Sequence, residues 1–146
     1  MSSVTSALSD VAASLSPDEL TKKVEEIKAA GNERFLKGDY TQAKALYTDA
    51  LSLNPNIVAI YSNRAICELK LEQYGLAIAD ATKAIELDAT FAKAYYRRAC
   101  AHLAILDPKA ALPDLKMVVK LDPRNAQVKM QLDATCLLYT SLSGLA

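Results

Sequence analysis

The feature that most constrains this 146-residue chain is a repeat of 34 residues. When the sequence is shifted against itself by that length, small residues align with small ones and large apolar residues with large ones. Three copies follow one another without a gap, at residues 24–57, 58–91 and 92–125. The aligned columns include Gly31/Ala65/Ala99, Ala43/Ala77/Ala111, Ile27/Tyr61/Tyr95, Phe35/Leu69/Leu103 and Leu53/Leu87/Leu121. Such a repeat indicates stacked units that bury their apolar faces on their neighbours.

The units are expected to be helical, because the chain holds 25 Ala but only 4 Gly and 5 Pro. The small columns let paired helices approach closely, and Pro55 and Pro123 end the second helix of their units. The predicted fold class is all-α, an α-solenoid of three helix–turn–helix repeats plus a C-terminal capping helix. Helices are predicted at residues 17–37, 40–53, 58–71, 74–87, 92–105 and 109–121, with the capping helix from about residue 126.

Local signals support these boundaries, with one irregularity. Ser16 and Glu19 flank Pro17 in a capping-box pattern, and Asp39 precedes the second helix. Pro113 lies inside the predicted helix 109–121, where it removes an N–H and clashes with the carbonyl of Lys109. We expect that helix to start late or to kink.

The two ends of the chain depart from the repeat pattern. Residues 1–15 contain five Ser and few large apolar groups, which predicts a disordered N-terminal tail. The folded domain is expected to span residues 16–133. Residues 134–146 carry no charge, although a capping helix usually has a charged outer face. This segment is either a frayed tail or the place where a longer protein was truncated or its ending replaced; we favour the second interpretation.

Several classes of protein are disfavoured. The 17 basic and 17 acidic residues balance, so no net charge attracts nucleic acid or an acidic membrane. No apolar run reaches the ~18 residues that span a bilayer, and the first basic residue is Lys22, which argues against a targeting signal. Three distant cysteines and one histidine argue against a disulfide scaffold, a metal site and any cofactor. Reduced thiols favour the cytoplasm or the nucleus.

The repeat columns resemble the tetratricopeptide repeat (TPR), a helix–turn–helix unit of 34 residues. In that family the first helix of each pair lines a concave groove. Here those helices carry the candidate groove residues Lys28, Asn32, Asn63, Lys93 and Arg97. Glu25 is the only acid at helical pairing distance from any of them. We therefore expect largely unpaired cations and amides to converge on a small anion.

These five positions are similar to the carboxylate clamp of co-chaperone TPR domains. The similarity lies in residues 28–32, 61–64 and 93–99. It implies that the groove binds acidic C-terminal tails of the Glu-Glu-Val-Asp type, from heat-shock chaperones of the ninety- and seventy-kilodalton classes. Lys70 is a secondary candidate for a peripheral charge contact, and Tyr96 is a candidate for lining the groove.

Residues 74–88 and 95–99 are similar to the TPR domains of the serine/threonine protein phosphatase 5 family, over about residues 20–135. In that family a metallophosphatase domain follows the TPR. This chain has no Gly-Asp-x-His-Gly, Gly-Asp-x-x-Asp-Arg-Gly or Gly-Asn-His-Glu motif, so we expect no catalytic residues and no enzyme activity of its own. Two alternatives to tail binding stay open: an autoinhibitory or targeting segment of a phosphatase, and a scaffold that uses its convex face. A monomer is expected.

Other polar and reactive residues are expected to serve the fold. Arg64 and Arg98 are predicted to turn toward a neighbouring helix. His102, Cys67 and Cys100 are predicted to be packed side chains. The tyrosines on the repeat columns are predicted to lie in the core: Tyr47, Tyr61 and Tyr95.

Overall fold

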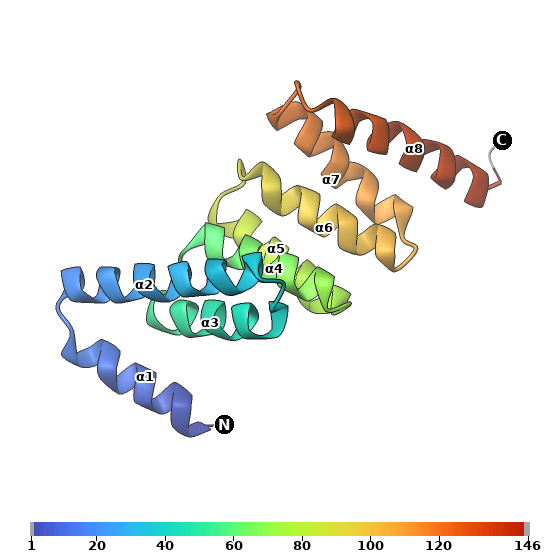
Figure 1. The fold of residues 1–146 in the computed structure, drawn as a ribbon. Helices are drawn as coiled ribbons and strands as arrows, with labels where there is room; N and C mark the ends of the chain where they lie inside the picture. The colour runs from blue at the N-terminus through green and yellow to red at the C-terminus, as the bar shows by residue number, and fades with distance from the viewer. Residues whose placement is uncertain (1, 145–146) are drawn as a thin grey trace.

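The structure is a computed structural model that describes residues 2–144. Its helices are α1 (Ser2–Ser14), α2 (Pro17–Leu36), α3 (Tyr40–Leu53), α4 (Val58–Lys70), α5 (Tyr74–Leu87), α6 (Ala92–Ala104), α7 (Pro108–Leu121) and α8 (Ala126–Leu142). Helices α2/α3, α4/α5 and α6/α7 form hairpins that stack one after another, and α8 packs on the last of them (Figure 1). The predicted solenoid of three repeats with a capping helix is confirmed.

The helix starts follow the predicted caps. The Ser16 side chain accepts a hydrogen bond from the Glu19 N–H, and the Glu19 carboxylate accepts one from the Ser16 N–H, so the capping box is complete. Asp39 accepts from the Gln42 N–H at 3.2 Å at the start of α3. Each of these bonds satisfies a backbone donor that the first turn of a helix leaves free.

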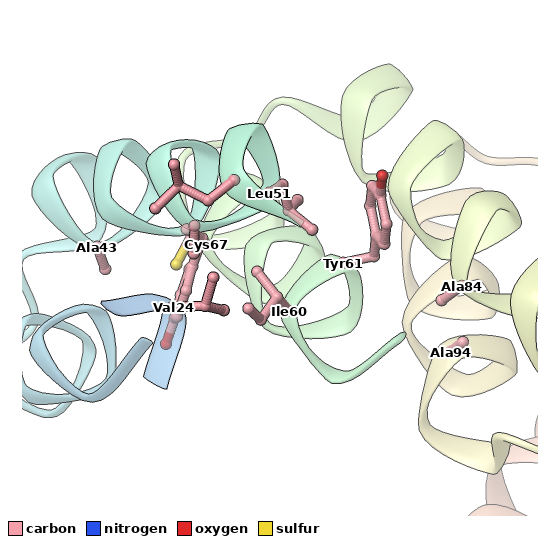
Figure 2. Packing of buried hydrophobic residues seen from close by; sticks show 11 residues of the cluster. Val24, Ala43, Leu51, Ile60, Tyr61, Cys67, Ala84 and Ala94 are labelled. Atoms are coloured by element: carbon pink, nitrogen blue, oxygen red, sulfur yellow. The ribbon is translucent and has the colours of Figure 1, made fainter. Parts of the chain in front are cut away.

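The first hydrophobic core lies between α2, α3, α4 and α5 and reaches the start of α6 (Figure 2). Ala43 and Ala50 of α3 are fully buried there, which lets α2 and α4 approach closely. Gly31 is the tightest point, because a Cβ built at this residue would lie 2.7 Å from Cε1 of Tyr47. The small residues of the repeat columns therefore lie where helices touch, as the sequence predicted.

A second core joins α6, α7 and α8. Tyr95, Ala99, Leu115 and Val118 are buried in it, and Val128 of α8 closes it at the C-terminal end. This is the covering role that a solenoid requires of its terminal helix.

Residues 2–14 form helix α1, which differs from the expected disordered tail. Its apolar residues Leu8 and Ala12 pack against the first core, and α1 lies across α3. A low content of large apolar residues made this segment look unable to pack, but two residues at i and i+4 suffice because they share one face of a helix.

Helix α7 starts at Pro108 and runs through Pro113 to Leu121. The expected late start is therefore wrong. The missing N–H of Pro113 falls near the beginning of the helix, and its ring is exposed, so the neighbouring helices do not have to accommodate it.

Helix α8 continues through the uncharged segment to Leu142, so fraying does not describe residues 134–142. Thr135 is buried, and its hydroxyl donates to the Gln131 carbonyl at 2.7 Å. The interpretation that a longer protein was truncated or its ending replaced stays a prediction, and residues 145–146 lie outside the described part of the chain. Within residues 2–144, no helix combines the length and the apolarity needed to cross a bilayer.

Candidate functional site

The structure joins two of the predicted groove residues directly. Asn32 of α2 and Asn63 of α4 meet through a hydrogen bond of 3.4 Å from Asn63 Nδ2 to Asn32 Oδ1. The Tyr47 hydroxyl of α3 donates to the same oxygen at 2.6 Å. Because both donors use the oxygen of Asn32, its NH₂ group keeps both hydrogens for another acceptor.

Tyr47 thus orients a candidate site residue from the core. Burial raises the pKa of Tyr47 to about 12, so its hydroxyl stays a donor throughout the physiological range. The sequence analysis placed Tyr47 in the core but missed this role. The available signal was a hydroxyl in a repeat column that otherwise holds Ala81 and Leu115.

Beside the two amides lies a hollow of about 190 Å³ with mostly apolar walls. It is lined by residues of the first three repeat helices, Asn32, Phe35, Leu36, Tyr47, Asn63 and Ile66. The sequence analysis missed Leu36 and Ile66 as lining residues, because exposed apolar side chains on single helices do not reveal which neighbours they face. The hollow gives the site room for an apolar group next to the amides.

The predicted cations lie on α2 and α6 and have no acidic partner. Within residues 2–144, the ion pairs shorter than 4.0 Å join five other pairs of residues and leave out Lys28, Lys93 and Arg97. Helix α6 packs against α4, which brings the α6 cations to the side of Asn63. A cation without a counter-ion in such a groove attracts an external anion.

Arg97 is the most desolvated of these cations. Its guanidinium lies over the Tyr96 ring, 5.5 Å from the centroid, and its Nε is buried without a hydrogen-bond partner. Burial lowers the pKa of Arg97 below its ordinary value, although the group remains charged. An anion that reached Arg97 would therefore relieve an existing desolvation cost.

The secondary candidates lie less centrally. Lys70 is exposed on the last turn of α4. Tyr96 is half-buried and lines a second hollow together with Lys93. No contact in the structure joins Lys70 to the two amides.

Arg64 and Arg98 serve the fold, as predicted. Arg64 makes a bidentate bond to Asp80 at 2.7 and 2.6 Å, and its third nitrogen donates to Thr48 at 3.2 Å. Arg98 repeats this pattern 34 residues later, with Asp114 and Thr82. Each arginine thus ties its own hairpin to the second helix of the preceding one.

The thiols and the histidine show no sign of chemistry. Burial raises the pKa of Cys67 to about 11 and also raises that of Cys100, which disfavours the reactive thiolate. His102 is half-buried, and its Nδ1 has no partner. No group of three or more potential metal ligands occurs within residues 2–144.

Comparisons with known proteins agree with this geometry. The sequence profile of the tetratricopeptide repeat matches residues 28–90. Serine/threonine-protein phosphatase 5 of Homo sapiens is 42% identical over 114 residues, which are 78% of this chain and 23% of that protein. The first TPR of Spaghetti (RPAP3), bound to the HSP90 peptide SRMEEVD, has a TM-score of 0.79 and 28% identity, covering 82% of this chain and 94% of that one.

A further solved structure is the TPR2B domain of yeast Sti1 in complex with pHsp70, with a TM-score of 0.69 and 34% identity, covering 86% of this chain and 99% of that one. The chain therefore belongs to the tetratricopeptide repeat family. Its predicted similarity to the phosphatase 5 group is confirmed, but the chain spans less than a quarter of the length of the human phosphatase.

Proposed function

We propose that this domain binds the acidic C-terminal tails of heat-shock chaperones of the ninety- and seventy-kilodalton classes. The binding residues are Lys28, Asn32, Asn63, Lys93 and Arg97. The observation that carries the proposal is the Asn32–Asn63 pair, whose free donors are set by Tyr47 and which lies beside cations without counter-ions. The Sti1 and RPAP3 domains, which are described as complexes with such tails, support the choice of ligand.

The two carboxylates of a terminal Asp match two groups of donors. The amides of Asn32 and Asn63, with Lys28, hold the main-chain carboxylate on the α2 and α4 side. Lys93 and Arg97 of α6 hold the Asp side chain. Charge-assisted hydrogen bonds of this kind are stronger than neutral ones, and only a free chain end ending in an acid supplies both carboxylates.

The hollow beside Asn32 and Asn63 takes an apolar side chain of the tail. Its walls include Phe35, Leu36 and Ile66, and the SRMEEVD peptide carries Met and Val. Lys70 adds a peripheral attraction for the upstream glutamates, and Tyr96 supports Arg97 from below.

The expected affinity is near micromolar. Each charge-assisted hydrogen bond contributes about 1.5–3 kcal/mol, but ordering a flexible tail opposes the sum. A net of about −7 to −8 kcal/mol corresponds to a Kd near 1 µM.

Calorimetry with SRMEEVD and with the same peptide carrying a C-terminal amide tests the proposal. The free acid is expected to bind at least tenfold more tightly, because the amide removes one of the two carboxylates. Lys93→Ala and Arg97→Ala are expected to weaken binding of the free acid. Lys116→Ala, which removes an exposed cation of α7, is the matched control. Equal binding of the acid and the amide would exclude the clamp.

A regulatory role in a phosphatase is the second candidate, favoured by the 42% identity to phosphatase 5. In this case the domain would cover the catalytic site of a separate or longer polypeptide. Adding the domain to an isolated catalytic domain of that family should lower hydrolysis of a small phosphate ester, and SRMEEVD should relieve the inhibition. Unchanged hydrolysis would exclude this role.

A further inference from the structure

A second hollow, of about 220 Å³, lies where α6, α7 and α8 meet. Its apolar walls come from Ala92, Tyr96, Val118 and Val128. Its polar lining residues are Lys93, Asp122, Asn125 and Gln127. The tail-binding proposal uses Lys93 and Tyr96 from this set and leaves the rest of the hollow unassigned.

The hollow exists because the repeat pattern breaks at the last junction. The residue before the first helix of each unit is Ile57 in the second repeat and Phe91 in the third, and both pack against the first core. At the start of α8 the same position is Asn125, which caps the helix through the Val128 N–H at 3.1 Å. A polar capping residue has replaced a large apolar one.

A second column loses its aromatic residue at the same junction. Tyr61 and Tyr95 are buried, and their hydroxyls donate to the carbonyls of Pro55 and Ala89 at 2.8 and 2.9 Å. The third member of this column is Lys129, which is exposed. The last junction therefore lacks the side chains that fill the two earlier ones.

The hollow is continuous with the clamp. Lys93 belongs to both, and Tyr96 forms one wall of the hollow while it carries the Arg97 guanidinium on its ring. In the proposed complex the side chain of the last residue points from the Asn32–Asn63 pair toward Lys93. A side chain longer than that of Asp would continue past Lys93 into this space.

The lining determines which side chain fits. Tyr96, Val118 and Val128 offer apolar surface, whereas the Asp122 carboxylate opposes a second anion. An apolar protein cavity of about 150 Å³ accommodates a benzene molecule, so the space suffices for a leucine or a phenylalanine side chain.

The geometry points to a subsite for the last residue of the bound chain end, formed by α6, α7 and α8. Through it, the groove binds tails that end in a large apolar residue as well as tails that end in Asp. This inference rests on the proposed carboxylate clamp, since Lys28, Asn32 and Asn63 hold the main-chain carboxylate in both cases. It adds a second class of partner, free C-termini ending in Leu or Phe.

Calorimetry with SRMEEVD, SRMEEVL, SRMEEVF and SRMEEVA tests the subsite. The peptides ending in Leu or Phe are expected to bind at least fivefold more tightly than the one ending in Ala. Asn125→Phe restores the residue type of the preceding junction and fills the hollow. In this variant the ratio of the Leu to the Ala affinity is expected to fall toward one.

Asn125→Ala is the matched control, because it removes the same helix cap but leaves the hollow open. It should keep the Leu-over-Ala ratio of the unchanged domain. Ala92→Val, which places the residue found at Val58 on the opposite wall, narrows the hollow without touching the cap and should lower the ratio. Thermal unfolding of each variant checks that the fold is retained.

The outcomes separate the two proposals. If SRMEEVD and its amide bind equally, the clamp is wrong and the subsite falls with it. If only the free acid binds but the Leu and Ala peptides bind alike, the clamp stands and the subsite is wrong. A Leu-over-Ala ratio that survives both Asn125→Phe and Ala92→Val would also overturn the subsite.

Discussion

At the scale of single residues, close packing and the candidate site share the same atoms. Gly31 leaves room for the Tyr47 ring, and the Tyr47 hydroxyl holds the oxygen of Asn32. A change in the small-residue column therefore reaches the groove through one aromatic side chain. The column and the binding residues are separate features of the sequence but one contact in the structure.

Gly31→Ala is expected to destabilise the domain by about 1–2 kcal/mol, because the added methyl overlaps Tyr47 and outweighs the gain of up to ~1 kcal/mol in helix propensity. Denaturant unfolding measures this change, and SRMEEVD binding should weaken with it. Gly75→Ala is the matched control, since nothing lies within 4 Å of a Cβ there. If both variants were equally stable, the Gly31–Tyr47 contact would not be limiting.

Glu68 is a buried carboxyl whose ionisation opposes folding. Burial and the neighbouring Asp80 raise the pKa of Glu68 to about 8 from 4.5, and Lys44 and Arg64 offset only part of this. Between these values the folded state holds a proton that the unfolded state has lost. The contribution of this group to stability is therefore present at low pH and falls as pH rises toward 8.

Glu68→Gln, which mimics the protonated form, is expected to be more favourable at pH 8 than at pH 5 by ~1–3 kcal/mol of unfolding free energy. Denaturant unfolding at the two pH values gives the comparison. Glu26→Gln, at an exposed position of α2, should show no such difference. The same effect of Glu68→Gln at both pH values would show that Glu68 is ionised in the fold throughout.

At the scale of helices, the hairpins are joined by a repeated polar tie. Arg64 and Arg98 each bind an Asp of their own hairpin and a Thr of the preceding one. The first repeat has Ala30 and Leu46 at the corresponding positions. The tie is thus found only where one hairpin stacks on another, which identifies its purpose as stacking.

Asp114→Ala is expected to cost about 3 kcal/mol, because it leaves the part-buried Arg98 without its bidentate partner. Thermal or denaturant unfolding measures this loss. Lys83→Ala removes an exposed pair with Glu86 that spans 4.0 Å and should cost no more than about 0.5 kcal/mol. A loss for Asp114→Ala as small as the control would mean that the tie adds geometry but little stability.

At the scale of the whole molecule, balanced charge conceals a local imbalance. The chain has 17 basic and 17 acidic residues, yet the ion pairs within residues 2–144 leave Lys28, Lys93 and Arg97 unpaired on the first helices of the hairpins. An acidic tail therefore meets a positive groove on a neutral protein.

Binding of SRMEEVD is expected to weaken several-fold as salt rises from 0.05 to 0.5 M, because the screening length falls from well above to well below ~10 Å. Calorimetry across this range measures the effect. The slope should be smaller for Lys93→Ala than for the unchanged domain, since one charge is missing. Affinity independent of salt would contradict an electrostatic clamp.

The sequence alone determined the helices, the stacking and which residues carry the chemistry. Helix positions depend on local propensity and caps, so α2 to α7 begin and end within a residue or two of the prediction. The repeat determined the order of stacking, because each unit buries the same columns. The side chains of a candidate clamp followed from residue type and from the resemblance.

Only the tertiary structure decided how those side chains are held. The Tyr47 hydroxyl on Asn32, the unpartnered Nε of Arg97 and the hollow beside Asn125 all depend on distances between helices that are far apart in sequence. Helix α1 was missed for the same reason, since it packs through Leu8 and Ala12 on a core made elsewhere. Local patterns specify elements, whereas side-chain partners are set by packing across them.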